Sequence, residues 1–539
     1  MTPWWNKSKI KLMDKKRKIE IYDTTLRDGA QGESVFFTLH DQIRITEKLD
    51  EFGFDYIEGG WPGSNPKAEE FFKKMAEHRL KHSKLVAFGS TRRKNLSPEK
   101  DPFLKALIES GADVITIFGK SWDLHVKDVF KISLDDNLKL IEDSISFLKA
   151  NGKIVFFDAE HFFDGYKENP DYAIKTLLVA EKSGAERLVL CDTNGGTLPF
   201  EVEQIISDVI KIVKTPIGIH AHNDSATAVG NSIAAVRAGA VHVQGTINGL
   251  GERCGNADLT AIIPILQIKM GFVCLEESNL KRLTELSRYV YEIANIVPPG
   301  NQPFVGFSAF AHKGGVHVDA VGKNPRTYEH IPPERVGNQR RILVSELSGK
   351  STILQKLKKF HLEKQPETIK KILDTVGQLE KEGYQFESAE ASFELMVRKL
   401  LGLYKKPFHV EGFRVIVEER NSKVVAEATV KIKVGKNIEY TVAEGNGPVN
   451  ALDNALRKAL IPFYPFLSNL KLTDYKVRIL HPEKATAAVT RVLVESMDEQ
   501  ESWGTIGLSE NIIEASWKAL VDSVEYKILK EISDVSQKV

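Results

Sequence analysis

The amino-acid sequence predicts an α/β protein that consists of a (β/α)8 TIM barrel, a helical linker region and a duplicated βββα domain of the α+β type. Two observations predict the barrel. Residues 18–280 alternate short β-branched runs with amphipathic helical segments, and polar residues follow nearly every run at its C-terminal end. A third observation predicts the last domain, because residues 406–539 contain three strand patterns and a helix pattern, twice in succession.

Eight apolar runs are expected to form the barrel strands, and each is followed by a helical pattern such as LHDQIRITEKLDEFG or NPDYAIKTLLVAEKSGA. Eight strand and helix pairs in ~250 residues match a (β/α)8 barrel, whose active site forms at the C-terminal ends of the strands. A doubly wound open sheet is the alternative, but it requires a Gly-rich phosphate turn after its first strand, where this sequence has none. The eight runs are KIEIYD, FDYIEGG, LVAFGS, DVITIFG, KIVFFDAE, ERLVLCDT, IGIHAHND and VHVQGTIN.

The composition is that of a globular protein with more than one domain: 539 residues, of which 42% are hydrophobic and 27% charged. A balance of 74 Lys and Arg against 73 Asp and Glu gives no global field that would recruit nucleic acid or an anionic membrane, so small-molecule partners are expected. Three cysteines make no disulfide framework, which suits a cytoplasmic protein. No stretch has the ~20 apolar residues that a membrane span needs.

Three further regions flank the predicted barrel. Residues 1–17 are basic, lack the apolar core of a signal peptide and are expected to form a disordered tail. Residues 281–405 are predicted to form helical linker and lid subdomains, and they include a long Gly- and Pro-rich interval at residues 298–337. Intervals of that length are usually functional or disordered. Residues 406–539 are predicted to be a regulatory domain, because the turn AEGNGPV leads into a helix N-terminus whose free N–H groups suit a carboxylate.

The pair His220 and His222 is the first candidate for chemistry. The two residues flank Ala221 on a predicted strand, so both imidazoles point to one side at the strand end. Alone, such a pair is equally consistent with a surface pair or a hydrogen-bonded core pair. The first strand ends in DTTLRDG, which places Asp28 at the same rim of the barrel. One carboxylate and two imidazoles form a ligand set for Zn²⁺, Mn²⁺ or Mg²⁺, and the histidines favour Zn²⁺ or Mn²⁺.

Other polar residues also fall at the strand ends, among them Glu58, Glu160 and Thr193. Glu160, Thr193 and the neighbours Arg27 and Asp28 have structural alternatives. Glu160 would merely pair with a barrel lysine, Thr193 would form a turn ahead of Asn194, and Arg27 with Asp28 would be a local ion pair. We expect separate roles for Arg27 and Asp28, because neighbours in sequence rarely pair well.

Four motifs, DTTLRDGAQ, LCDTNGG, HAHND and NGLGERCGN, together resemble the DRE-TIM metallolyases, in the Claisen-condensing branch that contains the 2-isopropylmalate, homocitrate and citramalate synthases. The resemblance continues through GGVHVDA and the βββα repeat, so it covers nearly everything after Lys18. The stretch IEGGWPGSNPKAEEFF is similar to the citramalate synthase subgroup. The first motif continues as DGAQGES, where many condensing enzymes have an acidic residue at the position of Ala30, and we expect no loss of activity from this difference.

The resemblance implies a role for each matching residue. The metal ligands would be Asp28, His220, His222 and Asn256, the last residue of GERCGN. Arg27 would hold the keto oxygen, and Glu160 and Thr193 would face the substrate across the metal.

Two residues after the barrel match positions that the family brings over the barrel mouth from the neighbouring subunit. They are His317, in GGVHVDA, and Tyr328, in NPRTY. His317 is the preferred base for the thioester methyl group, because an imidazole titrates near neutrality, with Glu160 and Tyr328 assisting. The structural alternative is that His317 only satisfies backbone groups beside Gly314 and Gly315.

The function implied by the resemblance is condensation of acetyl-CoA with pyruvate and water to (R)-citramalate and CoA, in a homodimer inhibited by isoleucine. A 2-isopropylmalate or homocitrate synthase, which takes a different keto acid, is the main alternative. A hydroxymethylglutaryl-CoA-type lyase is disfavoured by the segments after residue 280. An amidohydrolase barrel would have its His-x-His pair on the first strand instead of the seventh. A silent amino-acid sensor is disfavoured by the complete set of barrel ligands.

Overall fold

The structure is a computed structural model that describes residues 17–344, 353, 356–357, 366–420, 423–480, 488–499 and 501–537. Apart from Arg17, the predicted tail at residues 1–17 lies outside the described residues. The chain divides into two compact units. The first comprises residues up to Phe310 together with His330–Arg340, and the second comprises Ala311–Glu329 together with Arg341 onward. The domain boundaries expected at residues 280 and 405 remain predictions.

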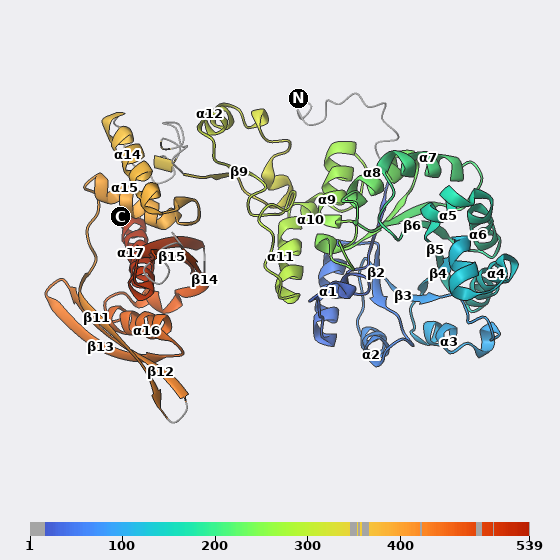
Figure 1. Cartoon of the computed structure of the whole chain (residues 1–539), viewed down its shortest axis with the longest axis horizontal. Helices are drawn as coiled ribbons and strands as arrows, with labels where there is room; N and C mark the ends of the chain where they lie inside the picture. The colour runs from blue at the N-terminus through green and yellow to red at the C-terminus, as the bar shows by residue number, and fades with distance from the viewer. Residues whose placement is uncertain are drawn as a thin grey trace. The chain divides into compact units, whose positions relative to one another are not determined.

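The first unit is built around a closed barrel of eight parallel strands in chain order, with β8 hydrogen-bonded back to β1 (Figure 1). This arrangement confirms the predicted (β/α)8 fold. Six of the predicted runs contain a strand, and β3 and β4 each extend one residue beyond the predicted run. The strands are β1 Glu20–Asp23, β2 Tyr56–Gly60, β3 Lys84–Ser90, β4 Val114–Lys120, β5 Ile154–Glu160, β6 Arg187–Asp192, β7 Ile217–Ala221 and β8 His242–Gly245.

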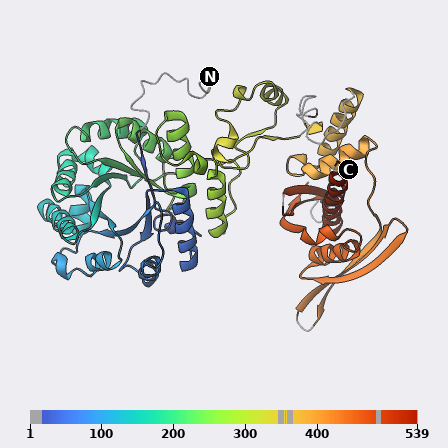
Figure 2. The ribbon, with the colours of Figure 1, turned by 180° about the vertical axis from the view of Figure 1, so that it is seen from behind.

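Helices surround the barrel, as both ribbon views show (Figures 1 and 2). Local sequence sets their ends. The first helix begins after Thr38, which forms a capping box with Asp41, and ends at Gly53, which has a φ of 78°. The helices that follow the strands are α1 Leu39–Phe52, α2 Pro66–Met75, α3 Pro102–Glu109, α4 Leu134–Ala150, α5 Phe162–Glu168, α6 Pro170–Lys182, α7 Pro199–Val209 and α8 Ala228–Ala238, and the unit continues with α9 Leu259–Pro264, α10 Glu277–Leu280 and α11 Leu283–Ile293.

Two apolar clusters stabilise the barrel unit. The larger one lies between strands and helices and contains outward-facing strand residues such as Ile21 and Ile57. The alternate residues Tyr22 and Tyr56 belong to a separate small cluster with Phe156. Since successive side chains of a strand point to opposite faces, this second cluster fills the barrel interior. The polar strand-end residues therefore lie above a packed floor.

The second unit contains the predicted duplication. Strands β11, β12 and β13 form one antiparallel sheet followed by α16, and β14, β15 and β16 form a second antiparallel sheet followed by α17. One hydrophobic cluster includes residues of both repeats, such as Leu456 of α16 and Leu520 of α17. The bounds are β11 His409–Arg420, β12 Lys423–Val434, β13 Asn437–Gly445, α16 Pro448–Leu460, β14 Lys471–Ile479, β15 Thr490–Met497, β16 Ser502–Ser509 and α17 Ile512–Gln537.

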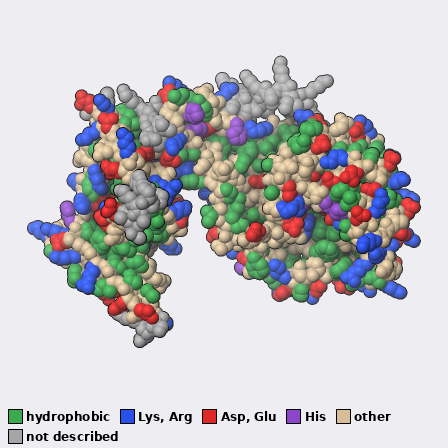
Figure 3. Space-filling view, viewed as in Figure 1, with side chains coloured by type: hydrophobic (Ala, Val, Ile, Leu, Met, Phe, Trp, Pro, Cys, Tyr) green, Lys and Arg blue, Asp and Glu red, His purple; other side chains and the backbone are tan. Residues whose placement is uncertain are grey.

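The linker part of the second unit is helical, as expected, and its described residues also include two short strands that were not expected. Its elements are β9 Ala311–His312, α12 Gly315–Lys323, β10 Arg341–Ile342, α14 Pro366–Glu382 and α15 Glu390–Leu400. Acidic and basic side chains are interspersed over the face of the protein in Figure 3. Among the described residues, no helix is both long enough and apolar enough to cross a membrane.

Candidate active site

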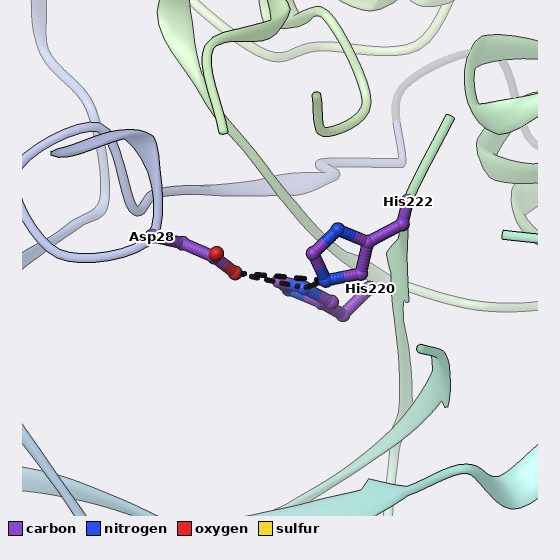
Figure 4. Close-up of side chains that lie close together, drawn as sticks. All are labelled: Asp28, His220 and His222. Atoms are coloured by element: carbon purple, nitrogen blue, oxygen red, sulfur yellow. Dashed lines mark hydrogen bonds and ion pairs between the residues drawn. The ribbon is translucent and has the colours of Figure 1, made fainter. Parts of the chain in front are cut away.

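The predicted Asp and His residues meet at one point above the barrel floor (Figure 4). Asp28 lies on the loop after β1, and His220 and His222 lie at the end of β7. The Nε2 atom of His220 is 3.2 Å from Oδ2 of Asp28 and 3.4 Å from Nε2 of His222, and Oδ2 of Asp28 is 3.9 Å from Nε2 of His222. All three side chains are buried.

The donor atoms of this group suit a divalent cation. Among the described residues it is the one set of three or more His, Cys, Asp or Glu side chains whose ligand atoms lie within 4.8 Å of one another. Asn256 pairs with His222 through a backbone bridge, and its predicted role as a fourth ligand remains a prediction. Its amide nitrogen donates to the Leu250 carbonyl over 3.1 Å, while its Oδ1 is buried and has no hydrogen-bond partner among the described residues. Two imidazole nitrogens and a carboxylate match the ligand preferences of Zn²⁺ or Mn²⁺.

Electrostatics keep Asp28 ionised. Burial opposes its charged form, but Arg27 and His220 outweigh burial and hold the pKa of Asp28 well below its ordinary value. Burial likewise opposes a charged His220, yet the hydrogen bond to Asp28 raises the pKa of His220. Burial and the neighbouring His220 lower the pKa of His222 to about 4, so His222 is neutral at pH 7. A carboxylate and a neutral imidazole are the forms that bind metals.

Arg27 contacts Glu58 as well as Asp28, and the separate roles expected for Arg27 and Asp28 remain a prediction. Its Nε donates to Glu58 over 2.6 Å, whereas Nη1 is 3.4 Å from Asp28. Glu58 is fully buried and also accepts from Tyr22, over 2.5 Å, and from Thr24. Sequence reasoning noted Glu58 only as a strand-end residue. The structure shows that Glu58 positions the guanidinium beside the metal-ligand group.

Glu160 and Thr193 lie in the same cavity as this group. Glu160 forms an ion pair with Lys120, so the structural alternative raised for this residue is present together with its position in the cavity. Thr193 accepts a hydrogen bond from the backbone N–H of His161 over 2.9 Å. His161 has a φ of 55°, which is uncommon for a residue other than glycine.

The wall of the cavity across from β7 is aromatic. Trp61 follows β2, Phe88 lies on β3 and Phe118 lies on β4, and all three line the cavity, whose volume is about 250 Å³. The rings of Phe88 and Phe118 stack at 5.6 Å, and Trp61 packs edge-on against both. The guanidinium of Arg27 lies 3.8 Å above the ring of Phe88. The family resemblance implied that the third and fourth strands form the wall, but sequence analysis did not identify the aromatic residues that line it.

Two further polar residues were missed. Asp158 lines the cavity two residues before Glu160 on β5, and burial raises its pKa to about 7. Gln244 is a buried polar residue on β8 that contacts both Asp158 and His220. The sequence contained a signal for each residue. Gln244 interrupts the apolar run VHVQG, and Asp158 is two positions before Glu160 and so shares its strand face.

His317 and Tyr328 belong to the second unit. Their rings stack on each other with centroids 4.1 Å apart. The structure thus brings this pair together, and their place at the barrel mouth remains a prediction.

A closed barrel with a buried Asp and His group at its strand ends defines a metal-binding (β/α)8 protein. Comparison with known proteins narrows the class. The HMGL-like family matches residues 18–290, the homocitrate synthase post-HMGL domain-like family matches residues 304–383, and the LeuA allosteric (dimerisation) domain matches residues 387–528. This chain belongs to the HMGL-like family, in the branch that contains the citramalate and 2-isopropylmalate synthases.

Relatives in this branch match the chain over nearly its whole length. An (R)-citramalate synthase of Geobacter sulfurreducens is 57% identical over 517 residues, covering 95% of this chain and 98% of that protein. An (R)-citramalate synthase of Aquifex aeolicus is 55% identical over 519 residues, covering 95% and 98%. A 2-isopropylmalate synthase of Methanocaldococcus jannaschii is 32% identical over 518 residues, covering 95% of each chain. The family resemblance predicted from the sequence motifs is confirmed.

Proposed function

We propose that the protein is an acyltransferase that condenses acetyl-CoA with pyruvate and water to give (R)-citramalate and CoA. The observation that carries this proposal is the buried group of Asp28, His220 and His222 beside Arg27, in a chain 46–57% identical to five (R)-citramalate synthases over nearly its full length. A 2-isopropylmalate or homocitrate synthase is the second candidate. It is favoured less, because the 2-isopropylmalate synthase relative is only 32% identical.

The aromatic wall supports pyruvate as the keto acid. In a closed eight-stranded barrel, β3 lies opposite β7, so a keto acid held near His220 and His222 points its side chain toward Phe88 and Phe118. Stacked rings leave less room for the keto-acid side chain than aliphatic residues would. The methyl group of pyruvate is the smallest side chain that still gives a tertiary alcohol as product. A larger keto acid would have to displace packed aromatic groups, which is unfavourable.

The keto acid and its metal are assigned as follows. A divalent metal (Zn²⁺, Mn²⁺ or Mg²⁺) held by Asp28, His220, His222 and Asn256 would polarise the keto carbonyl and fix the acid through its carboxylate. Arg27, held by Glu58, stabilises the negative charge that develops on the keto oxygen during carbon–carbon bond formation.

Proton transfer completes the reaction. A base removes a proton from the thioester methyl group, the methyl carbon bonds to the keto carbon, and the keto oxygen takes a proton to become a hydroxyl. Water then cleaves the thioester, which releases CoA as a thiol and leaves a carboxylate. We assign the base to His317 with Tyr328 beside it, from the neighbouring subunit. Glu160, paired with Lys120, and Thr193 orient the substrate.

The C-terminal repeats are assigned to regulation and dimerisation. The matching domain family is described as allosteric and dimerising. One face of β13 exposes Ile438, Tyr440 and Val442, an apolar row that suits contact with a second copy. We propose a cytoplasmic homodimer that is inhibited by isoleucine, the end product toward which citramalate leads.

A comparison of four keto acids tests the substrate assignment. Purified protein is incubated with acetyl-CoA and either pyruvate, 2-oxobutanoate, 2-ketoisovalerate or 2-ketoglutarate, and both free thiol and the chiral product are measured. We expect the highest kcat/KM with pyruvate and a product of R configuration. A preference for 2-ketoisovalerate or 2-ketoglutarate would instead assign the second candidate function.

A further inference from the structure

Gln244 connects one metal-ligand candidate to a buried carboxylate. It lies on β8 and has no exposed surface. Its Oε1 is 2.9 Å from Nδ1 of His220, and its Nε2 is 3.2 Å from Oδ1 of Asp158. The three side chains come from β5, β8 and β7 and form a hydrogen-bonded row inside the barrel.

The chemistry of these groups decides which nitrogen of His220 carries the proton. An amide NH2 group only donates hydrogen bonds, and Nε2 of Gln244 lies 3.2 Å from Oδ1 of Asp158, so Asp158 accepts from Gln244. The amide oxygen then faces His220 and accepts from its Nδ1–H. Nδ1 of His220 therefore keeps its proton, so a metal would displace the Nε2 proton that faces Asp28 at 3.2 Å and would bind the lone pair left on Nε2.

The reverse orientation of the amide would work against metal binding. It would place the amide oxygen against the Asp158 carboxylate and the NH2 group against Nδ1 of His220. The proton of His220 would then lie on Nε2, in the space between the ligand atoms. Nδ1 of His222, by contrast, is buried without a hydrogen-bond partner among the described residues, so the row orients His220 specifically.

We propose that Gln244, oriented by Asp158, is a positioning residue that holds His220 in the tautomer that binds the divalent metal. The proposal rests on the metal site of the proposed function and adds a residue to it. Partners of this kind fix the ring orientation of a histidine ligand and raise its basicity, and their loss weakens metal binding by about 10- to 100-fold.

Metal affinity separates this role from simple filling of the barrel interior. Full-length protein at pH 8 is stripped of metal and titrated with Co²⁺ against a chelating indicator, and the d–d absorption of bound Co²⁺ is recorded. The test variant is Gln244→Leu. The matched control is Gln302→Leu, since Gln302 is another buried glutamine of the same unit, whose amide bonds to Asn248, Asp258 and Thr260.

A conservative variant provides the rescue. Gln244→Glu keeps an acceptor opposite Nδ1 of His220, and one proton shared between the new carboxyl group and Asp158 leaves the net charge unchanged. We expect Gln244→Leu to bind Co²⁺ about 10- to 100-fold more weakly with an altered spectrum. Gln244→Glu and Gln302→Leu should bind within about threefold of the wild-type affinity. If Gln244→Leu does not fold by circular dichroism, Gln244→Met fills the same space and carries the same expectation.

Two results overturn the proposal. One is a folded Gln244→Leu or Gln244→Met protein with the wild-type affinity and spectrum. The other is an equal loss of affinity in Gln302→Leu, which would indicate a general effect of removing a buried amide. Wild-type protein that binds no divalent metal would instead contradict the proposed metal site itself, so the two failures are distinguishable.

Discussion

Glu58→Gln tests how the barrel controls the charge beside the reacting carbonyl. The substitution keeps the shape of the side chain and removes its charge. Glu58 is fully buried and lies 2.6 Å from Nε of Arg27, which has little exposed surface of its own. In the variant, Arg27 keeps its contact with Asp28, at 3.4 Å.

The expected magnitude follows from burial. Two unit charges about 4 Å apart interact by about 4 kcal/mol at an effective dielectric constant of 20. Removing one member of a buried pair costs about 3–5 kcal/mol, because the other charge loses its partner. The remaining contact with Asp28 compensates in part. We therefore expect Glu58→Gln to lower the free energy of unfolding by about 3 kcal/mol, at the low end of that range. Arg27 then turns toward Asp28 and away from the keto oxygen.

The assay is steady-state thiol release from acetyl-CoA with pyruvate, with metal content measured on the same samples. Loss of an oriented cation at a developing oxyanion costs about 10²- to 10³-fold in turnover. We expect a decrease of that size in kcat/KM for Glu58→Gln. A folded variant whose kcat/KM stays within about twofold of the wild-type value would refute the reasoning, because a twofold change is about 0.4 kcal/mol and lies far below the expected effect.

Glu20→Gln provides a matched control. Glu20 begins β1, at the opposite end of the strands from the cavity, and accepts from Arg187 over 2.6 and 2.9 Å. Burial opposes its charged form, but His242 and Arg187 lower the pKa of Glu20 to about 2. The stability that this carboxylate supplies is therefore present above the ordinary glutamate pKa and is lost as the pH falls toward 2. We expect the control to lose stability at pH 7 and to keep its kcat/KM.

Three other predictions concern the metal, the keto acid and the second subunit. His222→Ala should lose bound divalent metal and condensation while circular dichroism stays unchanged, and full metal content with near-normal turnover would contradict the ligand assignment. Phe118→Ala should raise kcat/KM for 2-ketoisovalerate relative to pyruvate by about 10- to 200-fold, because each methylene in an apolar pocket contributes about 1–3 kcal/mol. Unchanged selectivity in a folded Phe118→Ala variant would remove the aromatic wall from substrate choice. Inactive His317→Ala and inactive Asp28→Ala proteins, co-assembled as verified mixed dimers, should regain partial activity, and no recovery would favour a site within one chain.

The barrel was predictable because its signals are local. Each strand is a short β-branched run between helical patterns, and β-alternation alone places His220 and His222 on one side. The position of Asp28 at the same rim follows from the general rule for strand ends in this fold. Asn256 was identified only through its motif, because the bridge that brings it to His222 joins segments 34 positions apart.

The rest of the site was not predictable because it depends on contacts between distant strands. Phe88 and Phe118 stack across β3 and β4, and Gln244 reaches Asp158 across the barrel interior. The closure of the barrel and the register of its strands bring these side chains together. Neither feature can be predicted from the hydrophobic periodicity of a single sequence. The contact between Glu58 and Arg27 was unpredictable for the same reason, since nothing near Glu58 in the chain indicates it.

The most direct test of the central claim compares thiol release and (R)-citramalate formation in one metal-stripped sample before and after a divalent metal is restored. The account predicts that stripped protein releases almost no CoA from acetyl-CoA and pyruvate. Restoring Zn²⁺, Mn²⁺ or Mg²⁺ should recover equal amounts of thiol and (R)-citramalate, and no metal should recover them in His222→Ala. Equal activity in stripped and restored wild-type protein, or thiol release without citramalate, would contradict it.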